Sequence, residues 1–252
     1  MAAMGKIPFM TSYAMFSPGR NWEQIRTTIC YNNRNVKIAG SHAGVSVGPD
    51  GGTHQAIEDI ALMRVIPRMV VLVPCDAIEA KKATIAAAKM EGPVYIRLAR
   101  EKTPVITTEL SPFEIGKAQI FFGAKEGTGH KIGIIASGAL VYQALKVAQD
   151  LEEEGISVSV MNLATIKPMD EDAIINLAKS MGKILTIEEH QVAGGMGSAV
   201  AEVLARRNPV PMEFIGVEDK FGQSGTPDEL LGHCGMGIKT IIEKAKKLLG
   251  RV

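Results

Sequence analysis

Two histidines, two aspartates and four glycines are concentrated in the segment SHAGVSVGPDGGTHQAIEDIALMR, residues 41–64. Glycines allow tight turns and a close approach of the backbone to a ligand. Loops held by a rigid scaffold often carry binding residues. His42, Asp50 and His54 are therefore candidate site residues, although a histidine near a helix start is often structural and an aspartate in a glycine-rich turn often only forms the turn.

His54 follows Thr53, which the pattern predicts as the N-cap of a helix over about residues 54–65. The dipole at a helix N-terminus favours a neutral imidazole. A neutral imidazole can accept a proton or hydrogen-bond to an oxygen atom. This placement predicts an acid–base or oxygen-binding role for His54.

Polar residues also follow three apolar stretches that read as strands. His42 follows VKIAG, Cys75 and Asp76 follow MVVLVP, and Arg100 follows VYIRLA. In an open parallel sheet, ligands bind beyond the carboxyl ends of the strands. We expect these residues to share a cleft in which Arg100 could hold a phosphate by bidentate hydrogen bonds, the alternative being a surface ion pair.

Two other kinds of site are disfavoured. His42 and His54 are twelve residues apart and no carboxylate pair has ligand-like spacing, so we expect no metal site in this chain. The glycines of GGMGSAV, residues 194–200, do not form GxGxxG, and no acidic residue follows at the usual distance. We interpret them as glycines that allow close packing at a helix start.

Composition limits the partners. The chain has 252 residues, 46% of them hydrophobic, and a net charge of +1 with no long run of like charge, which offers no electrostatic case for nucleic acid or an anionic membrane. No apolar run is long enough to span a bilayer. The three cysteines are far apart and form no CxxC pair, which is typical of a reducing, cytoplasmic setting. A small polar ligand is the favoured partner.

Apolar strand candidates alternate with helical stretches along the chain, which predicts an α/β fold of two domains with mainly parallel, doubly wound sheets. The predicted boundaries are 1–103 for the first domain, 104–117 for a proline-containing linker and 118–252 for the second domain. Asp76 and Glu79 have the spacing of a capping box at the start of one helix. The first domain shows only three or four strands, so we expect it to be incomplete at its N-terminal edge.

Several motifs in this order resemble transketolases. TSYAMF, the SH pair, GPDGGTHQ, VVLVPCDAIEA and GPVYIRLAR are similar to the pyrimidine-binding domain of that family, and IKPMD, EEH and GGMGSAV are similar to its C-terminal domain. FSPGRNWEQIR, residues 16–26, resembles in particular the C-terminal subunit of split, two-chain transketolases. The resemblance implies thiamine diphosphate bound between two chains and transfer of two-carbon ketol units between sugar phosphates, as in the pentose phosphate pathway.

The resemblance also implies roles for individual residues. Tyr13 and Phe16 match aromatic residues that pack on the aminopyrimidine ring of the cofactor, although Gly19 stands where single-chain members have a third aromatic residue. His42 and His54 match histidines that contact substrate oxygens and assist proton transfer.

Two further positions match substrate ligands of the family. Asp50 matches a carboxylate that binds a sugar hydroxyl, and Arg100 matches an arginine that binds the substrate phosphate.

The glutamate that activates the cofactor in this family lies upstream of the position matching Met1. The diphosphate-binding domain, with its Mg²⁺ or Ca²⁺ ion, belongs to a separate N-terminal subunit in the split branch. The resemblance therefore implies a chain that is inactive alone and forms a heterotetramer with that subunit, with a homodimer contact between copies of this chain.

Three alternatives stay open. Within the enzymes, deoxyxylulose-phosphate synthase and the beta subunit of a 2-oxo acid dehydrogenase have related sequences, but Asp50 and Arg100 favour a sugar phosphate. Outside the enzymes, the same fold could serve as a non-catalytic assembly module.

Overall fold

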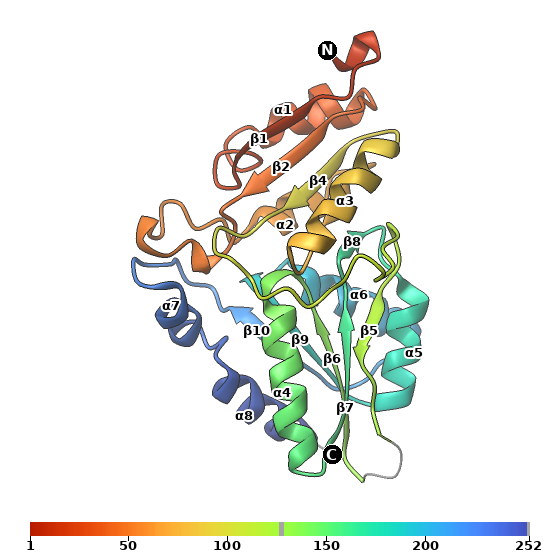
Figure 1. Ribbon diagram of the computed structural model, residues 1–252, viewed down its shortest axis with the longest axis vertical. Helices are drawn as coiled ribbons and strands as arrows, with labels where there is room; N and C mark the ends of the chain where they lie inside the picture. Colours follow the sequence, from red (N-terminus) through yellow and green to blue (C-terminus); the bar gives the residue numbers. More distant parts are fainter. Residues whose placement is uncertain (126–128, 251–252) are drawn as a thin grey trace.

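The computed structural model describes residues 1–125 and 129–250 and is built around two five-stranded sheets (Figure 1). The first sheet has the order β1-β2-β4-β3-β8, with strands Phe9–Tyr13, Lys37–Ser41, Val94–Arg97, Val70–Leu72 and Thr165–Lys167. The second has the order β10-β9-β6-β7-β5, with strands Met212–Val217, Ile184–Gln191, Lys131–Ala136, Ser157–Asn162 and Gln119–Phe122. All pairs are parallel except those made by β8 and β5. The predicted α/β class with mainly parallel sheets is confirmed.

Helices follow most strands, and Figure 1 shows them packed around both sheets, with the two chain ends at opposite ends of the molecule. The N-terminal half contains η1 Ala2–Met4, α1 Trp22–Gln24, the π-helix η2 Ile25–Tyr31, η3 Val45–Asp50, α2 Asp59–Arg64 and α3 Ala77–Lys89. The C-terminal half contains η4 Gly138–Leu140, α4 Val141–Glu153, α5 Glu171–Met181, α6 Met196–Arg207, α7 Pro227–His233 and α8 Ile238–Leu249.

The inner strands are apolar because helices cover both faces of each sheet. Every residue of β3, β4 and β7 is buried. Near-continuous burial of this kind is typical of parallel sheets enclosed on both faces. Because β2, β3 and β4 run parallel, their carboxyl ends lie at one edge of the first sheet, where the predicted site was expected.

The N-terminal and C-terminal halves contribute to the same sheet and to the same hydrophobic cluster. Strand β8 comes from the C-terminal half, yet it pairs antiparallel with β3 through Val71↔Lys167 and Leu72↔Thr165. One hydrophobic cluster contains Met63 and Val71 together with Met161 and residues farther along the chain. The first sheet therefore has five strands rather than the three or four counted from its own sequence, because one strand is supplied from elsewhere.

The predicted start of α2 was wrong. The helix begins at Asp59 with Glu58 at the N-cap, and residues 52–54 form a turn, so Thr53 caps no helix. The chain stays non-helical here because its backbone groups pair elsewhere: the Ala56 carbonyl accepts from Gly44 N–H and the Ile57 carbonyl from Gln191 N–H, at 2.8 Å each.

Candidate active site

Four of the six predicted site residues lie in one cluster of rings. The ring of Tyr13 stacks on that of His42, with centroids 3.9 Å apart and planes 9° apart. His54 meets both aromatic residues edge to face, at 5.4 Å from Phe16 and 6.2 Å from Tyr13. The centroids of Tyr13 and Phe16 are 6.2 Å apart. Residues from three separate segments of the chain thus form a single aromatic and imidazole surface.

The parallel pairing of β1 and β2 brings the first two members together. Tyr13, the last residue of β1, pairs with Ser41, the last residue of β2. His42 follows with a φ of +57°, a conformation that is uncommon outside glycine. Phe16 is turned back by a bond from its backbone N–H to the Tyr13 carbonyl at 2.9 Å. Strand ends and a tight turn therefore place the rings.

Hydrogen bonds orient the imidazole of His42. The Ser41 hydroxyl donates to the Ser12 carbonyl at 3.2 Å, so its oxygen is available to accept from Nδ1 of His42 at 3.1 Å. This arrangement favours the tautomer that carries its proton on Nδ1. Nε2 is then the acceptor nitrogen, and it can take a proton from a bound hydroxyl or hydrogen-bond to one.

The imidazole of His54 has one local partner. Its Nδ1 lies 2.9 Å from Oγ1 of Thr53. His54 is held by a turn and by ring contacts with Phe16, because the helix of its segment starts only at Asp59. The predicted placement of His54 at a positive helix end was therefore wrong, and the structure instead places its ring against those of Phe16 and Tyr13.

Asp50 and Arg100 lie outside the ring cluster. Asp50 is the last residue of η3 and is exposed. Nη1 of Arg100 donates to the Val47 carbonyl at 2.5 Å, and its Nε is 3.8 Å from the carboxylate of Glu101. The guanidinium is thus bound to the glycine-rich loop and to a surface carboxylate, the second of which is the alternative weighed for it.

The loop glycines approach other parts of the protein. A Cβ on Gly44 would stand 2.4 Å from the Glu189 carboxyl group, and a Cβ on Gly51 would stand 2.5 Å from Oγ of Ser224. Both glycines also have positive φ, at +92° and +74°. These glycines are required because the loop packs against the C-terminal half, a reason that the sequence alone did not indicate.

Cys75 and Asp76 were expected in the cleft with the histidines, and this was wrong. Cys75 is 2% exposed, and burial raises the pKa of its thiol well above the ordinary range. Asp76 caps α3 by accepting from Glu79 N–H at 2.8 Å and also binds the backbone of Thr107 at 2.6 Å. The capping box is half formed, since the Glu79 carboxylate accepts from Cys75 N–H at 2.7 Å instead of closing on Asp76.

Sequence reasoning missed a buried polar cluster between the halves. Arg97 and Asp59 form an ion pair at 2.8 Å with side chains 7% and 1% exposed, and Tyr95 donates to the same carboxylate at 2.6 Å. Nη2 of Arg97 also donates to the Glu189 carbonyl at 2.8 Å. The signal was an arginine inside the apolar run VYIRLA, since a charge in a buried strand requires a buried partner.

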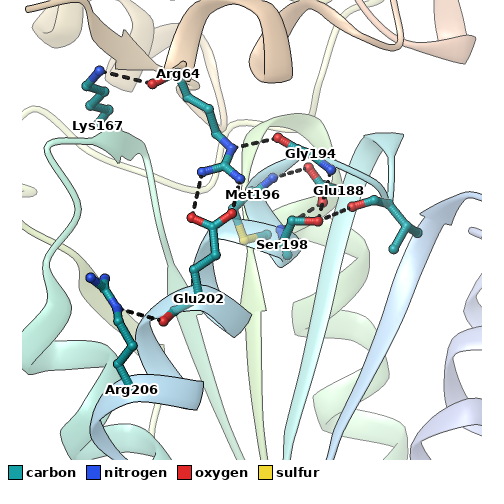
Figure 2. A network of polar contacts seen from close by, with 10 residues as sticks. Arg64, Lys167, Glu188, Gly194, Met196, Ser198, Glu202 and Arg206 are labelled. Carbon is teal, nitrogen blue, oxygen red and sulfur yellow. Dashed lines mark hydrogen bonds and ion pairs between the residues drawn. The ribbon is translucent and has the colours of Figure 1, made fainter. Parts of the chain in front are cut away.

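The N-terminus of α6 holds a carboxylate of the chain itself. Glu188 accepts from the N–H group of Met196 at 2.6 Å (Figure 2) and from that of Gly197 at 2.8 Å. Burial raises the pKa of Glu188 to about 7, against the lowering effect of those two donors. A helix N-terminus that could cradle a phosphate is therefore already occupied, which agrees with the predicted packing role.

Arg64 links α2 to α6 beside this carboxylate. Its guanidinium donates to the Gly194 carbonyl at 2.6 Å and to Glu202 at 2.5 and 3.1 Å, and Lys167 donates to the Arg64 carbonyl at 3.0 Å (Figure 2). The two halves are thus joined by directional bonds as well as by the shared core.

The part of the chain that the structure describes offers neither a metal cluster nor a membrane span. No group of three or more His, Cys, Asp or Glu within residues 1–125 and 129–250 could hold a metal ion. In the same described residues, every helix is too short or too polar to cross a membrane.

Comparison with known proteins identifies relatives along almost the whole chain. The family model described as "Transketolase, pyrimidine binding domain" matches residues 1–105, and that described as "Transketolase, C-terminal domain" matches residues 123–241. A "putative transketolase C-terminal section" from Methanocaldococcus jannaschii is 43% identical over 98% of this chain and 78% of its own length.

Two further relatives bear on assembly and substrate. The "6-deoxy-6-sulfo-D-fructose transketolase subunit SqwH" of Clostridium sp. is 38% identical over 100% of this chain and 76% of its own length. A solved structure described as "split gene transketolase, inactive beta4 tetramer" superposes with a TM-score of 0.91 at 42% identity, covering 98% of this chain and 78% of that one.

Proposed function

Because the chain belongs to the transketolase family, we propose that it is the C-terminal subunit of a split transketolase. In this proposal it transfers a two-carbon ketol unit between sugar phosphates, together with a subunit that binds the diphosphate of thiamine diphosphate. Residues 1–103 act as the pyrimidine-binding domain, 104–117 as a linker and 118–252 as the C-terminal domain.

One observation supports the proposal above the others, the grouping of Tyr13, Phe16, His42 and His54 at the carboxyl edge of a parallel sheet. Aromatic rings and imidazoles whose neighbouring centroids lie 3.9–6.2 Å apart suit a flat heterocycle beside a reacting oxygen. Neither the buried thiol of Cys75 nor the N-terminus of α6, which Glu188 occupies, offers such a combination.

The rings fit an aminopyrimidine. Phe16 is 43% exposed, so its ring can take a planar partner, whereas one face of Tyr13 is covered by His42. Thiamine diphosphate, when bound, supplies the carbon acid that cleaves and rejoins the ketol carbon–carbon bond. In the proposal Phe16 packs on the pyrimidine ring, and Tyr13 supports His42 from behind.

The histidines act on substrate oxygens. Nε2 of His42 accepts a proton from a sugar hydroxyl, and His54 hydrogen-bonds to the neighbouring carbonyl or hydroxyl oxygen. Asp50 binds a further hydroxyl. Arg100 binds the phosphate, for which it must exchange its bond to the Val47 carbonyl for the anion.

The partner supplies what this chain is proposed to lack. The relatives are named as subunits or as a C-terminal section, and one solved relative is described as an inactive tetramer of β chains. We therefore propose that this chain is inactive alone, that a Mg²⁺ or Ca²⁺ ion is bound by the N-terminal subunit, and that two copies of each subunit form the enzyme.

The sugar is proposed only as a class. One relative is named for 6-deoxy-6-sulfofructose. Another, an apulose-4-phosphate transketolase subunit from Phocaeicola vulgatus, is 37% identical over 98% of this chain and 79% of its own length. Both names describe a sugar with an anionic group, which suits Arg100. No particular pathway is assigned, since these relatives differ in their sugars.

The test is ketol transfer from a ketose phosphate to an aldose phosphate, with thiamine diphosphate, Mg²⁺ and the diphosphate-binding subunit. Activity is expected with both chains and absent with this chain alone. His42→Ala and His54→Ala are each expected to lower kcat/KM by roughly 10²–10⁴-fold, the usual range for loss of acid–base assistance.

His233→Ala is the matched control, because His233 is exposed at the end of α7. It should leave kcat/KM unchanged. Full activity of the His42 variant would remove the ring cluster from the mechanism. Inactivity of the wild-type pair with several ketose phosphates would favour a non-catalytic assembly module.

A further inference from the structure

A cavity separate from the ring cluster lies between the two halves. It measures about 480 Å³. Cavities that bind small molecules usually measure roughly 300–1,000 Å³. Its walls come from the ends of β3 and β4, the start of α3, the segment before α4 and the end of β9, and include Val73, Ala80, Leu98 and Ala139.

Its walls are mainly apolar, but a cation lies among them. Arg97 lines the cavity and is 6% exposed. Nε and Nη2 of its guanidinium donate to Asp59, and Nη2 also donates to the carbonyls of Ala56 and Glu189. Nη1 has no hydrogen-bond partner among the described residues, so it can donate a hydrogen bond to a ligand in the cavity.

Further groups make this end of the cavity favourable to an anion. The helix α4, of thirteen residues, begins next to it at Val141, after Gly138 and Ala139 of the cavity wall, so its positive end lies close to the cavity; the start of α3 also lies there, but its N-cap Asp76 already supplies a carboxylate. Glu189 also lines the cavity, and burial raises the pKa of its carboxyl group, which favours the neutral form.

The rim carries both signs of charge, in Glu101 and Lys102. The ion pair with Asp59 leaves the base of the cavity without net charge. Asp76 also lines the cavity, but its carboxylate is bonded to the N–H groups of Glu79, Ile106 and Thr107. The walls therefore offer an unpaired N–H donor beneath an apolar space, and the carboxylates of Asp59 and Asp76 already have partners.

We propose that this cavity is a binding site for a small monocarboxylate, with the carboxylate on Nη1 of Arg97 and the alkyl group between Ala80, Leu98 and Ala139. The site is distinct from the proposed active site, whose rings do not line it. It touches that site through Ala43, the neighbour of His42, so an occupant would bear on the segment that holds the imidazole.

The experiment is calorimetric titration of the full chain with sodium hexanoate, with hexan-1-ol as a neutral analogue of the same length and inorganic phosphate as a different anion. We expect hexanoate to bind at least tenfold more tightly than hexan-1-ol, and phosphate not to compete. Equal binding of the alcohol would overturn the role of Arg97. Competition by phosphate would overturn the assigned ligand class.

Variants locate the binding. Ala80→Trp, from α3, and Ala139→Leu, from the segment before α4, fill the cavity from opposite walls, and each should weaken hexanoate binding at least tenfold. Ile85→Trp is the control, since Ile85 is on α3 but 46% exposed and outside the cavity. If one filling variant unfolds, as judged by circular dichroism, the hexanoate affinity of the other variant is the test. Unchanged affinity in a folded filling variant, or no binding by the wild-type chain, would refute the site.

Discussion

Removal of the Asp59 carboxylate is expected to destabilise the fold strongly. Burial alone would raise the pKa of Asp59, but the charge of Arg97, with smaller contributions from His190 and from the hydrogen bonds of Arg97 and Tyr95, holds the pKa below the ordinary value. Asp59→Ala leaves a guanidinium that is 7% exposed without its counter-ion. Breaking a buried pair on one side costs about 3–5 kcal/mol.

The loss can be read from urea unfolding at a fixed chain concentration. For a slope of about 3 kcal/mol per molar urea, a loss of about 3–5 kcal/mol lowers the midpoint by about 1–1.7 M. Glu202→Ala is the matched control because Glu202 also pairs with an arginine, Arg64, but its side chain is 60% exposed. Pairs of this kind contribute about 0–1 kcal/mol.

A double variant separates the charge from the packing. Asp59→Leu combined with Arg97→Met removes both ions and should recover most of the loss, since apolar replacements of buried pairs are often neutral. If Asp59→Ala moves the midpoint no more than Glu202→Ala does, the ion pair is not what stabilises this part of the fold. If the double variant is as unstable as the single one, the loss comes from packing.

Three further predictions concern single groups. Gly44→Ala should destabilise by clearly more than Gly5→Ala, because both have positive φ but only the first would clash with a neighbour; equal losses would refute the clash. Burial lowers the pKa of His190 to about 4, so the unfolded state binds the extra proton and stability falls as pH drops from 6.5 to 4. His190→Gln should therefore show a fall smaller by up to about 3 kcal/mol in urea titrations across that range, whereas an unchanged fall would refute the assignment. Cys234 should be the first cysteine to react with a thiol reagent in the native chain, since Cys30 and Cys75 are buried, but it should react more slowly than a free thiol because partial burial raises its pKa; labelling of Cys75 ahead of Cys234 would contradict the packing.

The sequence predicted the parts of the fold that depend on local pattern. Buried strands such as Val94–Arg97 lie within the apolar stretches, here VYIRLA, from which they were predicted, because an apolar run bounded by turn residues is a local signal. The grouping of Tyr13 with His42 came from family resemblance, and the structure brings these residues together through the register of two parallel strands.

Features that depend on distant partners were not predictable in this way. The short strand Thr165–Lys167 has no pattern of its own and exists because it pairs with a strand far earlier in the chain. The helix at Asp59 starts late because the backbone carbonyl of Ile57 accepts from Gln191 N–H in the far half of the chain. The buried ion pair of Arg97 was not predicted, because its partner Asp59 lies on a helix far from it in the sequence.

Strand β8, which the C-terminal half contributes to the first sheet, limits how this protein can be recombined with a relative. A C-terminal half taken from a relative would bring its own version of Thr165–Lys167, and that strand would have to match the edge formed by Val71 and Leu72 of the recipient. The two sheets should therefore be exchanged together as one unit. A crossover point placed in the linker would combine, in one sheet, strands that come from two different proteins.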